Sequence, residues 1–184
     1  MRVITGLARG KRLRTLSGND VRPTTEKVKE AVFSSIQFEL ENSKILDLFA
    51  GCGQMGIEAL SRGALSAVFC DNSKEALDVV QDNLKTCELS DKAKVIRNDY
   101  LSFLSSCNEK FDICFLDPPY YAGYYENALN KLSGLIKPYG KVICEHPADI
   151  KLQDCYGNLK KQKDYRFSGI IISKYCLEGE EYEE

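Results

Sequence analysis

From Lys44 onward, short apolar runs typical of strands alternate with amphipathic patterns typical of helices, and this alternation constrains the fold more than any other feature. The strand-like runs are KILDLF, SAVFCD, AKVIRND, FDICFLD and GKVICEH, followed by a weaker NLKKQKDYRF and a β-rich GIIISKYCL. Between them lie the helical patterns MGIEALSRG, KEALDVVQDNLKTCEL, YLSFLSS and YENALNKLSGLI. Such alternation predicts an α/β fold with a mostly parallel sheet covered on both faces.

The segment before Lys44 has a different pattern. RVIT and KRLRTL alternate around GLARG, which predicts a short basic hairpin. RPTTEKVKEAVFSSIQFEL then offers a threonine cap and apolar residues at Val28, Val32, Ile36 and Leu40, the pattern of an amphipathic helix. With no repeat or long linker, we expect one domain over 1–184, made of an N-terminal extension (1–42), a core (43–177) and an acidic tail (178–184).

Composition narrows the class of protein. Hydrophobic residues make up 43% of the chain and charged residues 28%, as in an ordinary globular protein. Charge begins at the second residue and no apolar run reaches the length of a membrane span, so we expect a cytoplasmic protein without membrane contact. The eight cysteines never form C-x-x-C pairs, so we expect reduced structural thiols and no metal site.

Charge is unevenly distributed along a chain whose net charge is only -2. The first sixteen residues hold Arg2, Arg9, Lys11, Arg12 and Arg14 without an acid, whereas EGEEYEE at the end holds five acids. A basic front suggests nucleic-acid binding, but a run of charge is often only a solvated face. Both interpretations stay open on charge alone.

Ligands of parallel α/β sheets bind beyond the carboxyl ends of the strands. After the first strand comes DLFAGCGQMG, in which Gly51, Gly53 and Gly56 have the spacing of a nucleotide-binding loop. Asp71 follows the second strand, where an acid can accept bonds from ribose hydroxyls. Asp99 follows the third, placed either to accept from the exocyclic amine of a ligand base or to cap the next helix.

The fourth strand ends in Asp117, Pro118, Pro119 and Tyr120. The two prolines lack N–H donors and have a fixed φ, so the chain leaves the sheet stiffly and holds the Asp117 carboxylate and nearby carbonyls as acceptors. Tyr120 offers a flat face on which a base can stack, worth about 1–3 kcal/mol. An acid, a carbonyl and a ring held together predict a clamp for a planar group that bears an NH₂, acting by positioning and electrostatics.

The methyl donor that suits all four strand ends is S-adenosylmethionine, with Asp47 near its cationic methionine end. A nicotinamide dehydrogenase would explain the glycines, but it would give the proline clamp no role.

At this point the sequence resembles the RsmD-type methyltransferases, which modify the exocyclic N2 amine of one guanine in 16S ribosomal RNA. The resemblance rests on RVITGLARGKRL, VRPTTEKVKEAVFSSI, ILDLFAGCGQMGIEALSRGA, NDYLSFL and FDICFLDPPY, with GKVICEH also similar. DPPY is shared with other amino-methyltransferases, whereas the RG hairpin followed by RPTT is more specific. The resemblance implies a Rossmann-like class I methyltransferase sheet of seven strands, the last antiparallel, and an N-terminal extension that helps to hold RNA.

The resemblance also implies roles for individual residues. Gly51 and Gly53 would contact the cofactor, Asp71 its ribose and Asp99 its adenine amine. The remaining cofactor residues would be Asp47, Phe49, Asn72, Tyr100 and Asp117. The target base would meet Asp117, Pro118, Pro119 and Tyr120, and RNA phosphates would meet Arg9, Lys11, Arg12 and Arg22. Two positions depart from the family: Asp71, where glutamate is more frequent, and Cys52, where a small residue is usual.

Three functions are therefore weighed. The first is guanine-N2 methylation of 16S ribosomal RNA, in the small subunit or an assembly intermediate, by a protein expected to be a monomer. The second is a DNA or other RNA amino-methyltransferase, acting on adenine N6 or cytosine N4, although no region large enough for DNA target recognition is evident. The third is a non-catalytic RNA-binding assembly factor.

His146, the only histidine, invites a general-base role. A structural or substrate-shaping role is favoured, because the positively charged sulfonium donor needs little help from a base.

Overall fold

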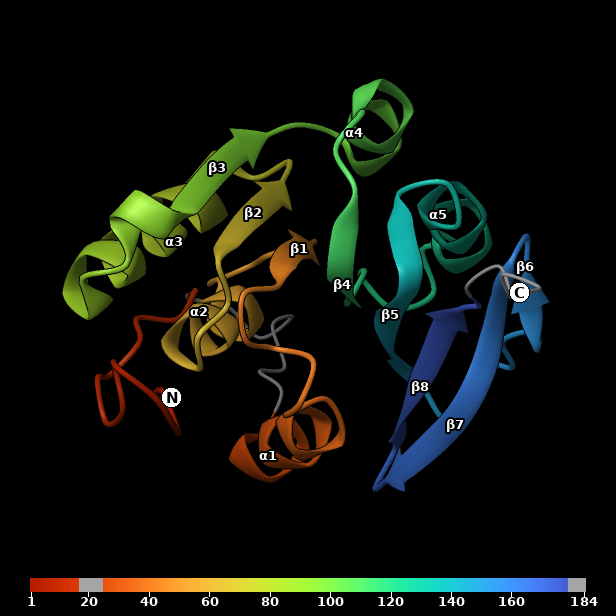
Figure 1. The fold of residues 1–184 in the computed structure, drawn as a ribbon, viewed down its shortest axis with the longest axis horizontal. Coiled ribbons are helices and arrows are strands. Elements are labelled where there is room, and N and C mark those ends of the chain that lie inside the picture. The colour runs from red at the N-terminus through yellow and green to blue at the C-terminus, as the bar shows by residue number, and fades with distance from the viewer. Residues whose placement is uncertain (17–24, 179–184) are drawn as a thin grey trace, which may run out of the picture.

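The computed structural model describes residues 1–16 and 25–178, which contain one eight-stranded sheet in the order β3-β2-β1-β4-β5-β8-β7-β6 (Figure 1). The strands are β1 (Lys44–Leu48), β2 (Ser66–Asp71), β3 (Ala93–Arg97), β4 (Phe111–Leu116), β5 (Ile136–Pro147), β6 (Cys155–Tyr156), β7 (Leu159–Phe167) and β8 (Ile170–Leu177). The first five are parallel to one another, and β8 runs antiparallel to both β5 and β7. The predicted fold class and antiparallel last strand are confirmed.

The strand count corrects the prediction, because the described residues form eight strands and not seven. The additional strand, β6, has two residues and pairs antiparallel with the outer side of β7. A strand of this length cannot show an alternating pattern, so only its pairing reveals it.

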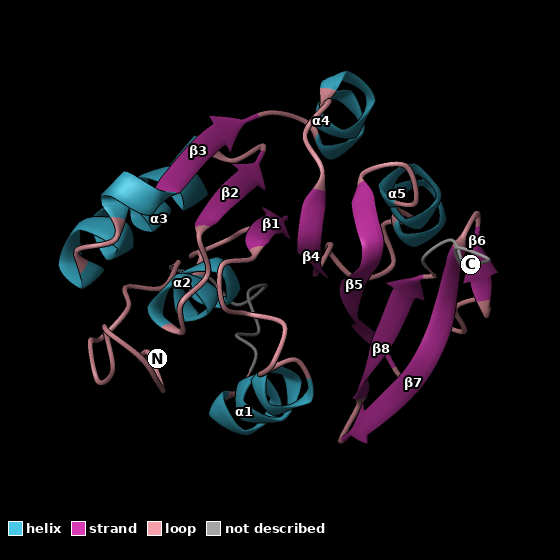
Figure 2. Ribbon diagram, in the orientation of Figure 1, coloured by secondary structure: helices cyan, strands magenta, loops and turns pink. Residues whose placement is uncertain are grey.

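Helices cover both faces of the sheet, with α1, α2 and α3 on one side and α4 and α5 on the other (Figure 2). Their bounds are α1 (Glu26–Ser35), α2 (Gln54–Ser61), α3 (Lys74–Cys87), α4 (Tyr100–Ser106) and α5 (Tyr125–Leu132), with a 3₁₀ turn at Ser90–Lys92. The predicted threonine cap is Thr25, whose hydroxyl accepts from the Val28 N–H. The first helix ends at Ser35, earlier than its apolar spacing suggests, although Ile36 and Leu40 remain buried.

The sheet separates two apolar clusters because successive strand residues point to opposite faces. Ile45, Phe69 and Phe115 face α1 to α3, whereas Leu46 and Leu116 face α4 and α5. All eight cysteines are free thiols, as predicted. In the described part of the chain, no helix is long and apolar enough to cross a membrane.

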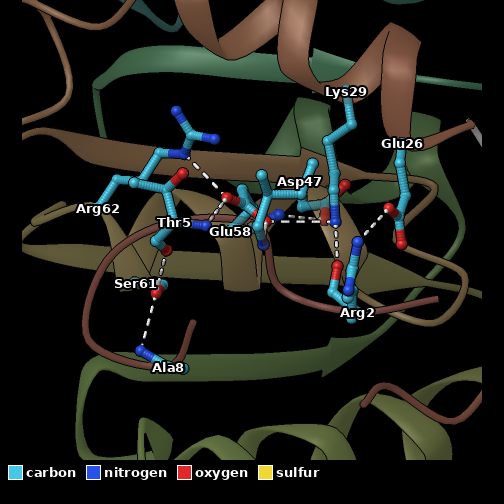
Figure 3. Close-up of polar contacts among 11 residues, drawn as sticks. Arg2, Thr5, Ala8, Glu26, Lys29, Asp47, Glu58, Ser61 and Arg62 are labelled. Atoms are coloured by element: carbon cyan, nitrogen blue, oxygen red, sulfur yellow. Dashed lines mark hydrogen bonds and ion pairs between the residues drawn. The ribbon is translucent and has the colours of Figure 1, made fainter. Parts of the chain in front are cut away.

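The N-terminal hairpin is held by side chains of α2. Arg2 and Arg12 form its single antiparallel bridge. The fully buried Glu58 carboxylate accepts from the N–H groups of Ile4 (2.8 Å) and Thr5 (3.0 Å). Ser61 also holds the hairpin: its hydroxyl accepts from the Ala8 N–H (3.0 Å) and donates to the Thr5 carbonyl (2.6 Å) (Figure 3). The extension therefore packs on the helix that begins at the predicted nucleotide loop.

Candidate active site

The glycine loop after β1 adopts a compact left-handed path. Phe49, Gly51 and Gly53 have φ values of 66°, 55° and 76°, a region that favours glycine and costs a residue with a side chain about 1 kcal/mol or more. The N–H groups of Phe49 and Ala50 both donate to the Cys70 carbonyl at 3.0 Å, which ties the loop to the end of β2. Gly53 is the N-cap of α2 and is buried beneath the loop.

Asp47, on β1, lies under the loop and is only 4% exposed. Its Oδ2 accepts from the Gly56 N–H at 2.9 Å. A Cβ atom on Gly56 would lie 2.4 Å from the Phe69 ring and 3.1 Å from Asp47 Oδ2, so this position requires glycine. Burial raises the pKa of Asp47 to about 7, with the Gly56 bond opposing the shift and the charge of Asp71 adding to it. A buried carboxylate of this kind favours a nearby cation.

The next two strand-end acids accept hydrogen bonds from backbone N–H groups. Asp71 accepts from the Gly51 N–H through Oδ2 (3.0 Å) and from the Ser73 N–H through Oδ1 (2.9 Å), which joins the glycine loop to the start of α3. Asp99 is the N-cap of α4, where its Oδ1 accepts from Leu101 and Ser102. The capping role of Asp99 is confirmed, within the described residues both capping bonds use the same oxygen, and the ligand role of Asp99 stays a prediction.

These acids border a hollow that we call the tyrosine hollow, lined by Phe49, Asp71, Asn72, Asp99, Tyr100 and Tyr124 among others. Three aromatic rings form one side of it: Phe49 and Tyr124 are stacked with centroids 5.8 Å apart, and Tyr100 lies 4.8 Å from Tyr124. Five residues that were predicted to bind the cofactor meet here: Phe49, Asp71, Asn72, Asp99 and Tyr100. Tyr124 was missed, and the only signal was the tyrosine-rich sequence after the prolines.

A second hollow, the loop hollow, shares Phe49 with the tyrosine hollow. It is lined by Thr15, Asp47, Gly51, Gln54, Met55 and Asp117 among others. Gln54 is 8% exposed, and its Oε1 has no hydrogen-bond partner among the described residues. Neither Gln54 nor Thr15 was predicted, because nothing in their local sequence places a helix start and an N-terminal segment at one site.

The clamp after β4 is anchored by a residue from β5. Asp117 is half-buried, Pro118 is buried and Pro119 is exposed. The Tyr120 hydroxyl donates to Glu145 Oε1 at 2.8 Å. Burial, and next the charge of Glu145, raise the pKa of Asp117 well above its usual range. Burial and the same glutamate also raise the pKa of Tyr120.

A third hollow, the acid pocket, opens beside this clamp on the α1 side of the sheet. Its apolar lining includes Val32, Met55, Phe115, Ile143 and Ile172, and its polar groups are the carboxylates of Asp117 and Glu145. Asp117 and Met55 also line the loop hollow, so the two hollows meet at these residues. Glu145 is a site residue that sequence reasoning did not assign.

The basic residues of the hairpin differ in their pairing. Lys11 pairs with Glu88 (3.3 Å) and Arg14 with Asp82 (2.8 Å) on α3 and its end. Arg9 and Arg12 are exposed, and no ion pair between described residues involves either of them. Arg22 lies outside the described residues. The hairpin therefore presents two guanidinium groups that form no ion pair within residues 1–16 and 25–178.

His146 lies in the interior, 2% exposed, and connects the last strands. Its Nε2 is 2.8 Å from the Ser173 hydroxyl, which donates to Asp164 at 2.6 Å. Burial lowers the pKa of the imidazole. This network joins β5, β8 and β7, which supports the structural role favoured for His146.

Comparison with known proteins covers the whole chain. A family model described as "Conserved hypothetical protein 95" matches residues 1–175. The Bacillus subtilis protein YlbH is 39% identical over 95% of this chain and 98% of its own length. The Haemophilus influenzae "Ribosomal RNA small subunit methyltransferase D" is 36% identical over 81% of this chain and 80% of its own length. The solved structure of yhhF from Escherichia coli superposes with a TM-score of 0.87 at 28% identity, covering 97% of this chain and 98% of that one.

Proposed function

This chain belongs to the RsmD-type family of ribosomal RNA methyltransferases, and we propose that it methylates the exocyclic N2 amine of one guanine in 16S ribosomal RNA with S-adenosylmethionine as donor. The observation that carries the proposal is the meeting of three hollows at the carboxyl ends of β1, β2 and β4. Two of them share Phe49, and two share Asp117 and Met55. A nucleoside and a target base could therefore lie on either side of one reacting centre.

The residues present fit S-adenosylmethionine. In the tyrosine hollow, Asp71 and Asp99 would accept bonds from the ribose and the adenine amine, beside aromatic rings that can stack on adenine. In the loop hollow, the buried Gln54 Oε1 lacks a partner among the described residues and would accept from the α-ammonium group. Asp47, whose pKa is about 7 because it is buried, would face a cation that favours its charged form.

The clamp would hold the target amine. Asp117 would accept one amine hydrogen, which directs the nitrogen lone pair toward the donor and opposes its delocalisation into the ring. The Glu145 bond fixes the Tyr120 ring, which can then stack on an extruded base without ordering it first. When bound, S-adenosylmethionine supplies an electrophilic methyl group, whose transfer to the amine leaves S-adenosylhomocysteine and releases a proton to water.

The N-terminal extension (1–42) would contribute phosphate contacts. Arg9 and Arg12 are exposed and unpaired within the described residues, while the hairpin that carries them is fixed to α2. Lys11 could also reach RNA by exchanging its exposed pair with Glu88, since such pairs are worth little. Arg22 stays a prediction. Phosphate contacts position RNA without reading its sequence, so the choice of guanine depends on RNA shape and on the pocket.

The function is tested with labelled S-adenosylmethionine and small ribosomal subunits that lack native modification. The RNA is digested, and the labelled nucleoside and its position are identified. We expect label only on the N2 amine of one guanine, and its loss by about 100-fold or more in Asp117→Ala, since a positioned acceptor contributes on that scale. Label on adenine N6 or cytosine N4, or on duplex DNA, would reassign the substrate. Binding of S-adenosylmethionine without methylation of any substrate would favour the hypothesis of a non-catalytic assembly factor.

The same assay with subunits and with naked 16S RNA would define the substrate form. Sedimentation of the protein alone would test the expected monomer. We propose that the protein acts in the cytoplasm, where small subunits are assembled.

A further inference from the structure

We propose that Glu145 determines the choice of base, by accepting the N1–H of guanine while Asp117 accepts the neighbouring N2 amine. This inference rests on the proposed function and deepens it, because it assigns base selection to a residue outside the DPPY sequence.

The acid pocket has the composition of a base-reading site. Its walls are apolar side chains from α1, α2, β4, β5 and β8, and the polar groups among its lining residues are two carboxylates, Asp117 and Glu145. An ionised carboxylate can only accept hydrogen bonds, and a protonated one still accepts through its carbonyl oxygen. The pocket therefore suits the edge of a flat group that presents two donors side by side.

The two carboxylates lie close enough to interact. Burial and then the charge of Glu145 raise the pKa of Asp117, so the pair shares one environment. Parallel pairing supports this, since Leu116 and Cys144 are in register on β4 and β5, which places Asp117 beside Glu145 one residue later. Both residues point to the face that carries Phe115 and Ile143, two positions away on their strands.

The Glu145 carboxylate is held rather than mobile. It is 7% exposed, and its Oε1 accepts from the Tyr120 hydroxyl at 2.8 Å. This bond links the group that would read the base edge to the ring that would stack on the base face. A fixed acceptor discriminates between bases because a mismatched edge leaves a buried polar group unpaired.

Among the four RNA bases in their usual tautomers, guanine has two adjacent donors, N1–H and the N2 amine, on its Watson–Crick edge. Adenine and cytosine each place a ring-nitrogen acceptor beside their exocyclic amine. A lone pair on that nitrogen would face the Glu145 carboxylate and be repelled. Two acceptors side by side in the acid pocket thus favour guanine and reject both alternative amino substrates.

The test replaces the mapped target guanine with 2-aminopurine, which keeps the 2-amino group and has an N1 acceptor in place of N1–H. Small subunits reconstituted with ligated 16S RNA carry either base. The wild-type protein is expected to prefer guanine by at least tenfold in kcat/KM for methylation. Equal rates on the two substrates would overturn the proposal without any variant.

Glu145→Gln sharpens the test. The amide oxygen can keep the bond from Tyr120, and the amide NH₂ then faces the base, where it opposes guanine N1–H and matches the N1 acceptor of 2-aminopurine. The guanine preference should fall by at least tenfold or reverse. A variant that loses activity on both substrates equally would show that Glu145 only supports the fold of the clamp, which would contradict the proposal.

Tyr120→Phe is the matched control, since it removes the anchoring bond and keeps both the ring and the carboxylate. It should lower methylation of both substrates and reduce the preference for guanine less than Glu145→Gln does, because the carboxylate that would accept N1–H is still present. S-adenosylmethionine affinity and thermal unfolding of each variant are measured alongside. If the proposed function itself is wrong, the wild-type protein will not methylate the N2 amine of guanine in unmodified subunits. That result differs from a loss of base preference.

Discussion

Two buried carboxylates lie close to each other in the fold and have opposite surroundings. Glu58, on α2, is fully buried and meets Lys29 Nζ at 3.2 Å, Arg62 Nε at 2.8 Å and two backbone N–H groups (Figure 3). Asp47, on β1, is nearly as buried and accepts from the Gly56 N–H, and no ion pair between described residues involves it. Among the described residues, the charge of Glu58 is compensated by cations and that of Asp47 is not.

The difference separates a structural role from a binding role. Removing a carboxylate from water is costly unless cations and donors replace its hydration. Around Glu58 these partners come from α1, α2 and the hairpin, so the charge joins three segments of the extension and the core. Around Asp47 the missing partner is a cation, which the sulfonium and ammonium groups of the proposed cofactor would bring. Each of the following changes tests this contrast, from the largest expected effect to the smallest.

Glu58→Gln should lower the free energy of unfolding by about 3–5 kcal/mol, because it leaves Lys29 buried without a counter-charge. Urea denaturation measures the loss. The control is Glu26→Gln, which removes an exposed pair with Arg2 (3.3 Å) and should cost no more than about 1 kcal/mol. Equal effects at the two positions would mean that burial does not distinguish them.

Asp47→Asn should stabilise the cofactor-free protein at alkaline pH. The folded-state pKa of Asp47 is about 7, above the ordinary unfolded value near 4, so the native state binds the proton more tightly. Stability of the wild-type protein therefore falls as pH rises from about 4 to about 7, by as much as ~4 kcal/mol, and then levels off. The asparagine variant has no carboxyl group at this position and therefore lacks this loss of stability with rising pH.

The measurement is the difference in unfolding free energy between Asp47→Asn and wild type from pH 4.5 to 8. A difference that grows with pH agrees with an uncompensated carboxylate. A difference independent of pH would show that Asp47 already has a compensating partner. Saturating S-adenosylmethionine should shrink the pH dependence in the wild-type protein, and the variant should bind this cofactor more weakly.

Gly56→Ala should cost about 1–3 kcal/mol, the usual penalty for overpacking a core, because its Cβ would lie 2.4 Å from the buried Phe69 ring. It should also weaken cofactor binding by displacing Asp47. Gly134→Ala is the matched control, since the added Cβ would be 3.6 Å from the Lys131 carbonyl, an ordinary contact. Thermal unfolding and calorimetric titration compare the two variants, and an unchanged Gly56→Ala would contradict the close packing at this position.

The order of strands and helices could be predicted from the sequence alone, and so could the acids that stand at strand ends. Asp47, Asp71, Asp99 and Asp117 all line hollows at the strand ends, because the carboxyl ends of parallel strands meet at one edge, and their ligand roles stay predictions. Caps such as Thr25 and Asp99 were also readable, since a cap is a contact across three residues. Signals of this kind are local and need no knowledge of the packing.

The distant segments that complete the site could be identified only from the three-dimensional structure. Glu145 reaches Tyr120 across 25 residues, Thr15 borders the loop hollow, and Tyr124 closes the aromatic side of the tyrosine hollow. The same holds for the compensation of Glu58 by Lys29 and for the two-residue strand β6. The spacing of apolar residues along a segment indicates which face of that segment is buried. The contacts named here depend instead on where helices and strands cross. Those crossings are set by packing between segments far apart in the chain.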